Sequence, residues 1–285
     1  MAKIELLDGA MGSELLKRGH NVPQHTWSAN INIDNPLIVE EIHKEYINAG
    51  SNYITTNTFR TTPRAFIKSG LNTNEATDIA KKSLNGAINV AKNAKNNKTK
   101  VLGSVAPLED CYMPDLFPGK SYAKKEFNNI LDSLYNAGID IFLLETMNSI
   151  TETRSCLEVI HESNLPIWVS FNLLDSIHIK SGETLVNAIK MTADFDVDCI
   201  LLNCNPIERT KESLKIVSEN CLTWGIYPNL GIGEPSPDGV ISNYYSDEDF
   251  LNLCKKAIDL GASVIGGCCG TSPRHIKLLR DNLLE

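Results

Sequence analysis

Short apolar runs rich in β-branched residues alternate with longer segments of helical period from one end of this sequence to the other. Such alternation is typical of βα units, in which helices connect parallel strands. The predicted strands are residues 4–8, 53–56, 101–105, 141–145, 167–171, 200–203, 224–228 and 263–267. The predicted helices are residues 36–49, 75–94, 123–137, 151–163, 183–193, 210–220, 247–260 and 273–284.

The number of units distinguishes two α/β architectures. Eight strand–helix pairs without a Pro/Gly/Ser-rich linker favour a closed barrel. An open doubly wound sheet, the alternative, would carry a glycine-rich phosphate loop after its first strand, and Asp8-Gly9-Ala10-Met11-Gly12 only approximates one. A length of 285 residues suits a single α/β barrel. We therefore predict an α/β protein with one (β/α)8 TIM barrel domain over residues 1–285.

The loops that follow the strands of such a barrel gather at one rim, where the active site lies. The longest of these segments are residues 60–74, 108–122, 172–182 and 231–245. Cys204 stands where the sixth strand ends, and Cys268 and Cys269 stand where the eighth ends. We therefore expect three thiols to converge at the C-terminal rim although they are far apart in the chain.

Three cysteine ligands with a fourth position left open are typical of catalytic zinc. Adjacent cysteines on a regular strand would point to opposite faces, so the glycines around Cys268-Cys269 are needed to bend the backbone. Two alternatives remain: Cys204 as a small buried hydrophobic residue with the pair filling a turn, or a vicinal disulfide or redox pair. We predict one Zn²⁺ per chain, held by Cys204, Cys268 and Cys269.

A zinc ion with three thiolate ligands suits a thiol substrate, which it would hold as a nucleophilic thiolate. Acidic side chains at Asp8 and Glu145 are candidates for binding an ammonium group, and the backbone at Gly9 and Ala10 for binding a carboxylate. Further polar candidates at strand ends are Asn57, Asn172 and Asn203. These residues describe an amino-acid pocket, although the carboxylates could instead be helix caps or surface ion pairs, and the asparagines could form turns.

Charge and hydropathy limit the kinds of partner that the protein can bind. A formal net charge of −8 without a dense basic cluster argues against nucleic acid. No run of about eighteen apolar residues is present in the sequence, which argues against a membrane span. The amino-terminal residues lack the pattern of a secretory signal, so we expect a cytoplasmic protein with reduced thiols. These features are compatible with a homo-oligomer.

Five segments together resemble the homocysteine S-methyltransferase family, in the family's order and over essentially the whole chain. They are Asp8-Gly9-Ala10-Met11-Gly12-Ser13-Glu14-Leu15, Thr56-Asn57-Thr58-Phe59, Glu145-Thr146-Met147, Asn203-Cys204 and Gly266-Gly267-Cys268-Cys269-Gly270-Thr271. The resemblance implies a zinc (β/α)8 barrel with Cys204, Cys268 and Cys269 as ligands. It also implies that Asp8, Glu145 and the Gly9-Ala10 backbone surround the amino-acid end of homocysteine.

The reaction implied by this resemblance is transfer of a methyl group from a positively charged donor to the homocysteine thiolate, which gives methionine. Candidate donors are betaine, S-methylmethionine and dimethylsulfoniopropionate, whose onium groups aromatic faces can bind. The aromatic candidates near the rim are Trp27, Phe59, Tyr112, Phe171 and Tyr227. Thr146 stands where the betaine enzyme carries a tyrosine, so the donor stays open.

Two other functions compete with this prediction. The chain could be a zinc- and homocysteine-binding subunit that takes its methyl group from a separate corrinoid or folate protein. It could also be a barrel aldolase or dehydratase with Glu145 as base, which would need no zinc.

Overall fold

The computed structural model describes residues 3–160, 163–233 and 241–284. The strands are β1 (Glu5–Leu6), β2 (Tyr53–Thr55), β3 (Lys100–Val105), β4 (Ile141–Met147), β5 (Ile167–Phe171), β6 (Cys199–Asn203), β7 (Trp224–Tyr227) and β8 (Val264–Ile265). The α-helices are α1 (Met11–Lys17), α2 (Ile31–Asp34), α3 (Pro36–Ala49), α4 (Pro63–Lys68), α5 (Thr73–Ala94), α6 (Lys120–Asn136), α7 (Ile150–Ile160), α8 (Leu185–Thr192), α9 (Ile207–Asn220), α10 (Asp247–Asp259) and α11 (Pro273–Leu283). Short 3₁₀ helices cover Trp27–Asn30, Pro114–Leu116 and Ala193–Phe195.

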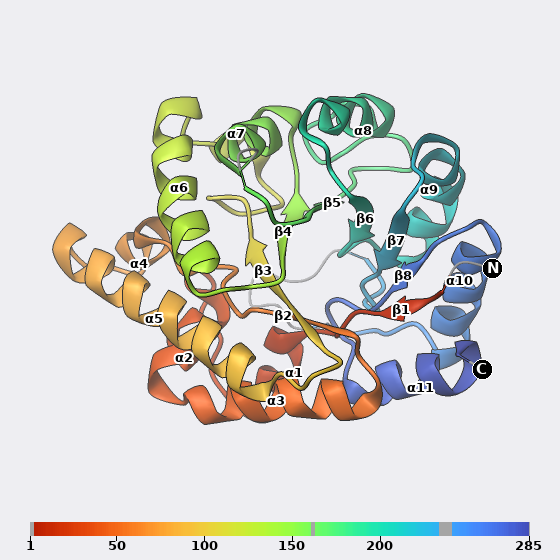
Figure 1. Cartoon of the computed structure of the whole chain (residues 1–285), viewed down its shortest axis with the longest axis horizontal. Helices are drawn as coiled ribbons and strands as arrows, with labels where there is room; N and C mark the ends of the chain where they lie inside the picture. Colours follow the sequence, from red (N-terminus) through yellow and green to blue (C-terminus); the bar gives the residue numbers. More distant parts are fainter. Residues whose placement is uncertain (1–2, 161–162, 234–240, 285) are drawn as a thin grey trace.

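The eight strands form one parallel sheet in the order β1-β8-β7-β6-β5-β4-β3-β2, and the helices surround it (Figure 1). Contacts between β1 and the start of β2 bring the two ends of the sheet together. The Asn52 side chain accepts a hydrogen bond from the Leu6 N–H at 2.7 Å, and the Asn52 N–H donates to the Leu6 carbonyl at 2.7 Å. The fold is therefore a nearly closed (β/α)8 barrel, as the sequence predicts.

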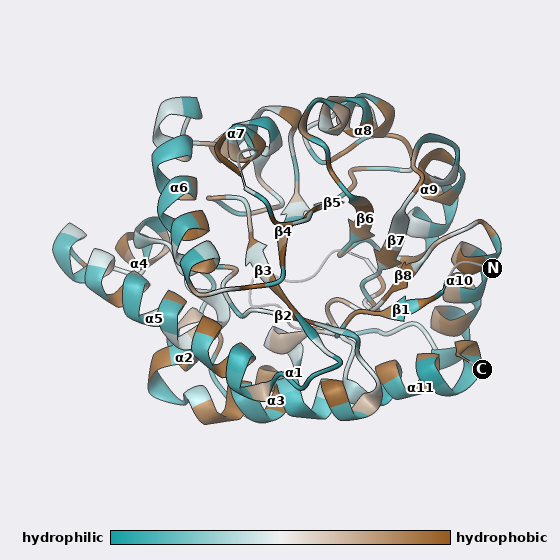
Figure 2. Cartoon of the chain, viewed as in Figure 1, coloured by the Kyte–Doolittle hydropathy of each residue, from teal (hydrophilic) through white to brown (hydrophobic). Residues whose placement is uncertain are grey.

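Alternation along the strands divides the core into two layers. Leu102, Leu143 and Leu201 lie in the smaller cluster inside the barrel. Their neighbours Phe142 and Leu202 belong to the larger cluster between the strands and the helices. Several helices carry hydrophobic and hydrophilic residues on different sides (Figure 2), as expected of helices that cover a sheet. The side chains of each strand therefore alternate between the barrel interior and the layer under the helices.

Several boundaries differ from the prediction. β1 and β8 have only two residues each, because the chain leaves the ladder before Asp8 and at Gly266. β4 continues to Met147 instead of ending at Glu145. The sequence interpretation missed helices α1, α2 and α4, which lie in the loops after β1 and β2. Residues 161–162 of the predicted helix 151–163, residues 234–240 of the segment 231–245, and residues 1–2 and 285 of the predicted domain lie outside the described residues.

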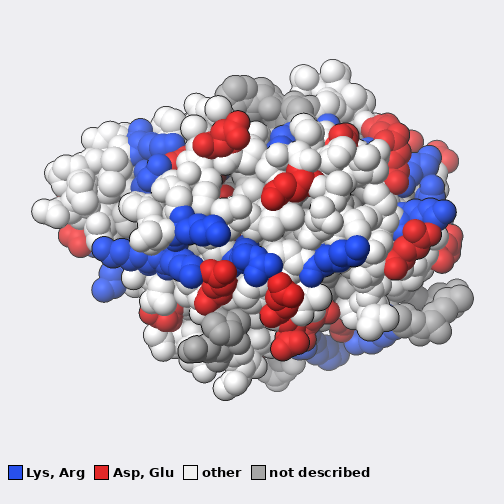
Figure 3. Space-filling view, turned by 90° about the horizontal axis from the view of Figure 1, so that it is seen from above, with Lys and Arg blue, Asp and Glu red and all other residues white. Residues whose placement is uncertain are grey.

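Among the described residues, no helix combines the length and apolar character needed to cross a membrane. Acidic and basic side chains are interspersed on the face seen in Figure 3.

Candidate active site

A cavity of about 510 Å³ lies at the carboxyl ends of the strands. The segments following β1, β2, β3 and β5 contribute to its wall, as do the ends of β4, β6, β7 and β8. Its lining includes the predicted site residues Asp8, Gly9, Ala10, Asn57, Glu145, Cys204, Cys268 and Cys269. It also includes four of the five predicted aromatic residues, Trp27, Phe59, Tyr112 and Tyr227.

Three cysteine sulfurs meet in the wall of this cavity. The Sγ atoms of Cys204, Cys268 and Cys269 all lie within 4.8 Å of one another. Cys204 Sγ is 3.5 Å from Cys269 Sγ, and Cys268 Sγ is 4.0 Å from Cys269 Sγ. Tetrahedral zinc with Zn–S bonds of about 2.3 Å separates its sulfur ligands by roughly 3.8 Å. The cluster therefore has the dimensions of a three-cysteine metal site.

The end of β6 directs Cys204 toward the other two thiols. Cys204 adopts a left-handed backbone conformation with φ 54°, which is uncommon for a residue with a Cβ. Its N–H donates to the Tyr227 carbonyl at 3.2 Å, and its carbonyl accepts from Asn172 Nδ2 at 3.3 Å. These contacts with the neighbouring strand ends hold the strained backbone in place.

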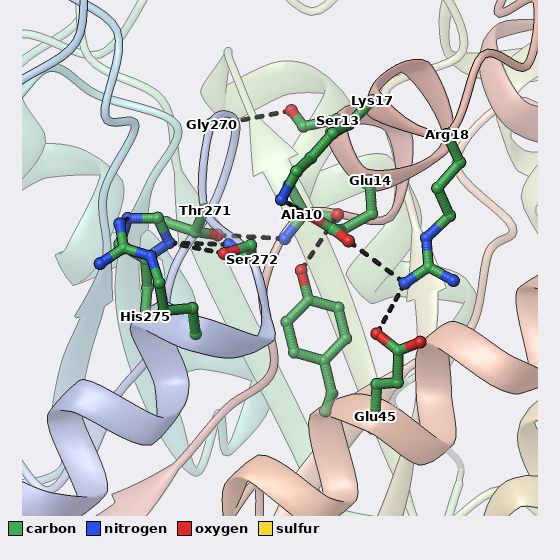
Figure 4. A network of polar contacts seen from close by, with 12 residues as sticks. Ala10, Ser13, Glu14, Lys17, Arg18, Glu45, Gly270, Thr271, Ser272 and His275 are labelled. Carbon is green, nitrogen blue, oxygen red and sulfur yellow. Dashed lines mark hydrogen bonds and ion pairs between the residues drawn. The ribbon is translucent and has the colours of Figure 1, made fainter.

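The loop after β8 presents Cys268 and Cys269 together. The Cys268 N–H donates to the Pro228 carbonyl at 2.9 Å, and the Cys269 carbonyl accepts from the Leu230 N–H at 2.9 Å. The turn then passes through Gly270, whose φ of 83° suits glycine. Its N–H donates to Ser13 Oγ at 2.9 Å (Figure 4). The glycine-assisted bend predicted from the sequence is therefore present.

Without metal, the three thiols share hydrogen bonds. The pKa of Cys269 is held well below its usual range because the Cys204 and Cys268 thiols donate hydrogen bonds to it. The pKa of Cys268 is raised well above its usual range by its hydrogen bonds to Cys204 and Cys269 and by burial. A cation bound by such a cluster would release the remaining thiol protons.

Tyr112 covers one side of the cluster. Its hydroxyl lies 3.4 Å from Cys204 Sγ, and burial raises its pKa well above the usual value. The Lys180 ammonium lies 5.0 Å from the centroid of the Tyr112 ring. The Arg60 guanidinium lies at the same distance from the Phe59 ring. Two of the four aromatic residues in the lining therefore already contact a cation of the protein.

Glu145 occupies an inward position of β4. Its carboxylate accepts a hydrogen bond from Ser104 Oγ at 2.6 Å. Its pKa is raised to about 7, mainly by burial and to a lesser extent by nearby Cys204, while the Ser104 hydrogen bond opposes the rise. A carboxylate poised near neutral pH in a cavity wall is suited to pairing with a substrate cation.

Asp8 has a structural role that the sequence did not reveal. Its carboxylate accepts hydrogen bonds from the Thr55 N–H at 2.7 Å and from Thr55 Oγ1 at 3.0 Å. These bonds connect the chain after β1 to the end of β2, where the sheet has its seam. Burial raises the pKa of Asp8 to about 8, although the Thr55 hydrogen bonds oppose the rise.

Three predicted site residues do not line the cavity. Phe171 is fully buried between the strands and the helices, because alternation along β5 turns it outward. Asn203 is buried inside the barrel, where its amide bonds to Ser170 and Thr146. Asn172 is buried beside the carbonyl of Cys204, which it supports. These asparagines hold the strand ends in position instead of facing the cavity.

The Ala10 N–H and the Asn57 amide, both expected to face the substrate, bond to other residues of the protein. The Ala10 N–H, predicted to hold a carboxylate, donates to Thr271 Oγ1 at 3.1 Å. Asn57 reaches the lining, but its amide also bonds to Ser28 and to Asn32. Lys180 and Arg60 line the cavity as well, and the sequence does not indicate them because they lie in long loops without a pattern. Thr146, noted in the sequence at the position of the betaine enzyme's tyrosine, also reaches the lining, with a φ of 59°.

Comparison with known proteins identifies the family to which the chain is similar. A sequence model of the family described as homocysteine S-methyltransferase matches residues 5–283. The chain is 30% identical to the homocysteine S-methyltransferase of Escherichia coli (strain K12), over 97% of this chain and 94% of that protein. It is 25% identical to the selenocysteine Se-methyltransferase of Brassica oleracea var. italica, over 98% and 89% respectively.

A solved structure, the metallated form of the homocysteine methyltransferase MmuM from Escherichia coli, matches with a TM-score of 0.82 and 28% sequence identity. The match covers 98% of this chain and 96% of that chain. The agreement in sequence and in fold extends over nearly the whole length, and the cysteine-lined cavity lies at the rim where a barrel enzyme works. The chain therefore belongs to the homocysteine S-methyltransferase family and is a methyltransferase.

Proposed function

We propose that this chain transfers a methyl group from a small onium donor to the thiol of homocysteine, giving methionine, with one Zn²⁺ held by Cys204, Cys268 and Cys269. The observation that carries the proposal is the convergence of three thiols in the wall of a cavity that is also lined by the carboxyl groups of Asp8 and Glu145. The names of the two enzyme relatives support it, since both act on a sulfur or selenium nucleophile of an amino acid.

Zinc is the metal that this donor set fits best, because soft thiolates in a tetrahedral arrangement favour it and no carboxylate or imidazole belongs to the described cluster. When bound, the ion would hold the substrate thiol as a thiolate near neutral pH. The chain itself would hold the rest of the acceptor. Glu145 receives the ammonium group in its ionised form, and the polar wall at Asp8, Gly9 and Asn57 surrounds the amino-acid end.

The donor is an onium compound such as betaine, S-methylmethionine or dimethylsulfoniopropionate. Of the four predicted aromatic residues that line the cavity, Trp27 and Tyr227 have no protein cation over the ring within the described residues. We therefore expect the methyl group to be presented from their side. Alignment of the methyl group with the acceptor sulfur in a confined cavity would supply much of the rate acceleration.

We also propose a cytoplasmic enzyme whose residues 1–285 act as one domain and whose partners are small molecules. The eight cysteines of the described structure are free thiols, and a thiolate metal site needs a reducing compartment. The net charge of −8 supports activity without nucleic acid or a membrane. A homo-oligomer is compatible with this function.

The test is methionine formation by reduced, zinc-loaded protein with homocysteine and each of the three donors, with bound zinc measured in the same sample. Cys268→Ser removes one ligand and is expected to abolish both zinc retention and product. Cys221→Ser is the matched control, because Cys221 lies at the end of α9 outside the cavity lining and should keep both.

Product with one donor and one zinc per chain would support the full proposal. Zinc without product from any small donor would favour the alternative in which a separate corrinoid or folate protein delivers the methyl group. Product that survives in Cys268→Ser would refute the metal site.

A further inference from the structure

The loops that follow β1 and β8 are held together by side chains as well as by the sheet. β1 and β8 pair over two residues each, and the last backbone bond between them runs from the Gly267 N–H to the Asp8 carbonyl at 3.1 Å. Beyond this point the contacts pass to the hydroxyl groups of Thr271 and Ser13 (Figure 4). One of these loops carries two cysteines of the metal site, and the other forms the cavity wall at Gly9 and Ala10.

Thr271 contacts both loops through a single hydroxyl group. Its Oγ1 accepts a hydrogen bond from the Ala10 N–H at 3.1 Å and donates to the Cys268 carbonyl at 2.7 Å. Its own N–H donates to the same Cys268 carbonyl at 3.0 Å. The hydroxyl thus donates one hydrogen bond and accepts another. Together they join the loop after β8, called the metal loop, to the loop after β1, called the acceptor loop because it lines the proposed homocysteine site. Because Thr271 is only 1% exposed, water cannot replace these bonds.

Packing fixes the same side chain between the two loops. A Cβ added at Gly9 would lie 2.6 Å from Thr271 Oγ1, and a Cβ added at Gly267 would also lie 2.6 Å from that atom. Both glycines therefore leave the space that Thr271 fills. On the other side of the acceptor loop, the Tyr46 hydroxyl donates to the Ala10 carbonyl at 3.1 Å. The Ala10 peptide is therefore held from both sides, by Thr271 and by Tyr46.

We propose that Thr271 is a positioning residue that couples the metal site to the amino-acid site, so that occupation of either site tightens the other. The proposal rests on the proposed function for the identity of the two ligands. Ordering of the cysteine loop by zinc fixes the Cys268 carbonyl, and through Thr271 it fixes the Ala10 peptide. By thermodynamic reciprocity, an amino acid bound against Ala10 tightens zinc by the same factor.

Homocysteine itself cannot test this coupling, because its thiol would contact the metal directly. L-2-Aminobutyrate has the same amino-acid end and no sulfur, so it cannot ligate the metal, and zinc can change its affinity only through the charge of the site or through the protein. Its affinity is measured by calorimetry with zinc-loaded and zinc-free protein, and zinc affinity is measured by chelator competition with and without it. Thr271→Val removes the hydroxyl at nearly constant volume, and Thr271→Ser retains it.

The parent protein is expected to bind L-2-aminobutyrate about fivefold or more tightly when zinc is present. Thr271→Val should bring the ratio of the affinities with and without zinc close to one, and Thr271→Ser should restore the ratio of the parent protein. The effect of charge is the same in all three proteins, so the difference reports the hydroxyl. Thr192→Val is the matched control, since Thr192 is also buried and donates to a backbone carbonyl, that of Ile189, outside the cavity lining.

A Thr271→Val protein that keeps the full ratio would overturn the proposal. So would one in which both affinities fall but the ratio stays unchanged, because that result describes a purely structural residue. If Thr271→Val does not fold, Thr271→Ala removes the same hydroxyl without adding a methyl group in its place and should lower the ratio in the same way. Parent protein that binds no zinc would instead refute the proposed function, so the two failures are distinguishable.

Discussion

Glu145→Gln is expected to stabilise the substrate-free protein above neutral pH and to weaken homocysteine binding. Burial raises the pKa of this carboxyl from 4.5 to about 7, even though Ser104 donates a hydrogen bond to it. The two values differ by 7 − 4.5 = 2.5, which corresponds to about 3 kcal/mol of folding free energy. The carboxyl is therefore costly to ionise unless a substrate cation is present.

The sign of the effect follows from which form the folded protein favours. A carboxyl with a raised pKa is favoured in its protonated form, so its contribution to stability is complete below pH 4.5. That contribution falls as the pH rises and is lost above pH 7, at a cost of about 3 kcal/mol. Glutamine stays neutral and avoids this loss. The advantage of the variant should therefore grow by about 3 kcal/mol between about pH 4.5 and 8.

Urea unfolding of metal-free, reduced protein at both ends of this range measures the stability change, and calorimetry with zinc-loaded protein measures homocysteine affinity. At pH 8 the variant should bind homocysteine about 2 kcal/mol more weakly, because an ammonium group loses its charged partner. Glu152→Gln is the control: the Glu152 pKa is also raised to about 7, mainly by burial, but the residue does not line the cavity. It should show the stability change alone. Identical pH dependence in parent and Glu145→Gln would refute the reasoning.

Three further substitutions test the residues in and around the site. Gly267→Ala would place a Cβ 2.6 Å from Thr271 Oγ1, so we expect a loss of about 1–3 kcal/mol in urea unfolding and a lower zinc content. Asn172→Ala removes the hydrogen bond to the Cys204 carbonyl and should lower zinc affinity about tenfold in chelator competition, whereas unchanged affinity would show that Cys204 needs no such support. Phe171→Leu should cost about 1–3 kcal/mol of stability and leave the donor KM unchanged, because Phe171 packs against the helices. A higher KM would show that Phe171 contributes to the donor site.

The barrel could be predicted because its signal is repeated. Eight strand–helix units reveal the topology even where individual boundaries shift, and the topology then brings Cys204 to Cys268 and Cys269. Helix α1 was missed because it is only seven residues long and has no capping side chain at Ala10. Such a short helix is stable only through its packing, which a local pattern does not contain.

The outward position of Phe171 follows from alternation along β5. Trp168 lies in the cluster inside the barrel, so strict alternation places Ser170 inside and Phe171 outside. The asparagines are different, because a polar residue at a strand end can face a ligand or support the neighbouring backbone. Only the hydrogen bonds of Asn172 and Asn203 show that they support the strand ends.

Asp8 shows why residue type alone could not distinguish a structural role from a binding role. A carboxylate offers about four acceptor positions, and Thr55 uses two of them, so closure of the seam leaves capacity for a substrate ammonium. Thr271 likewise combines a structural role with a position at the site, because its hydroxyl joins two loops. Both residues lie where the two-residue ladder of β1 and β8 has ended and the cavity begins. Side chains there must replace backbone pairing, and this requirement orients the groups that face the substrate.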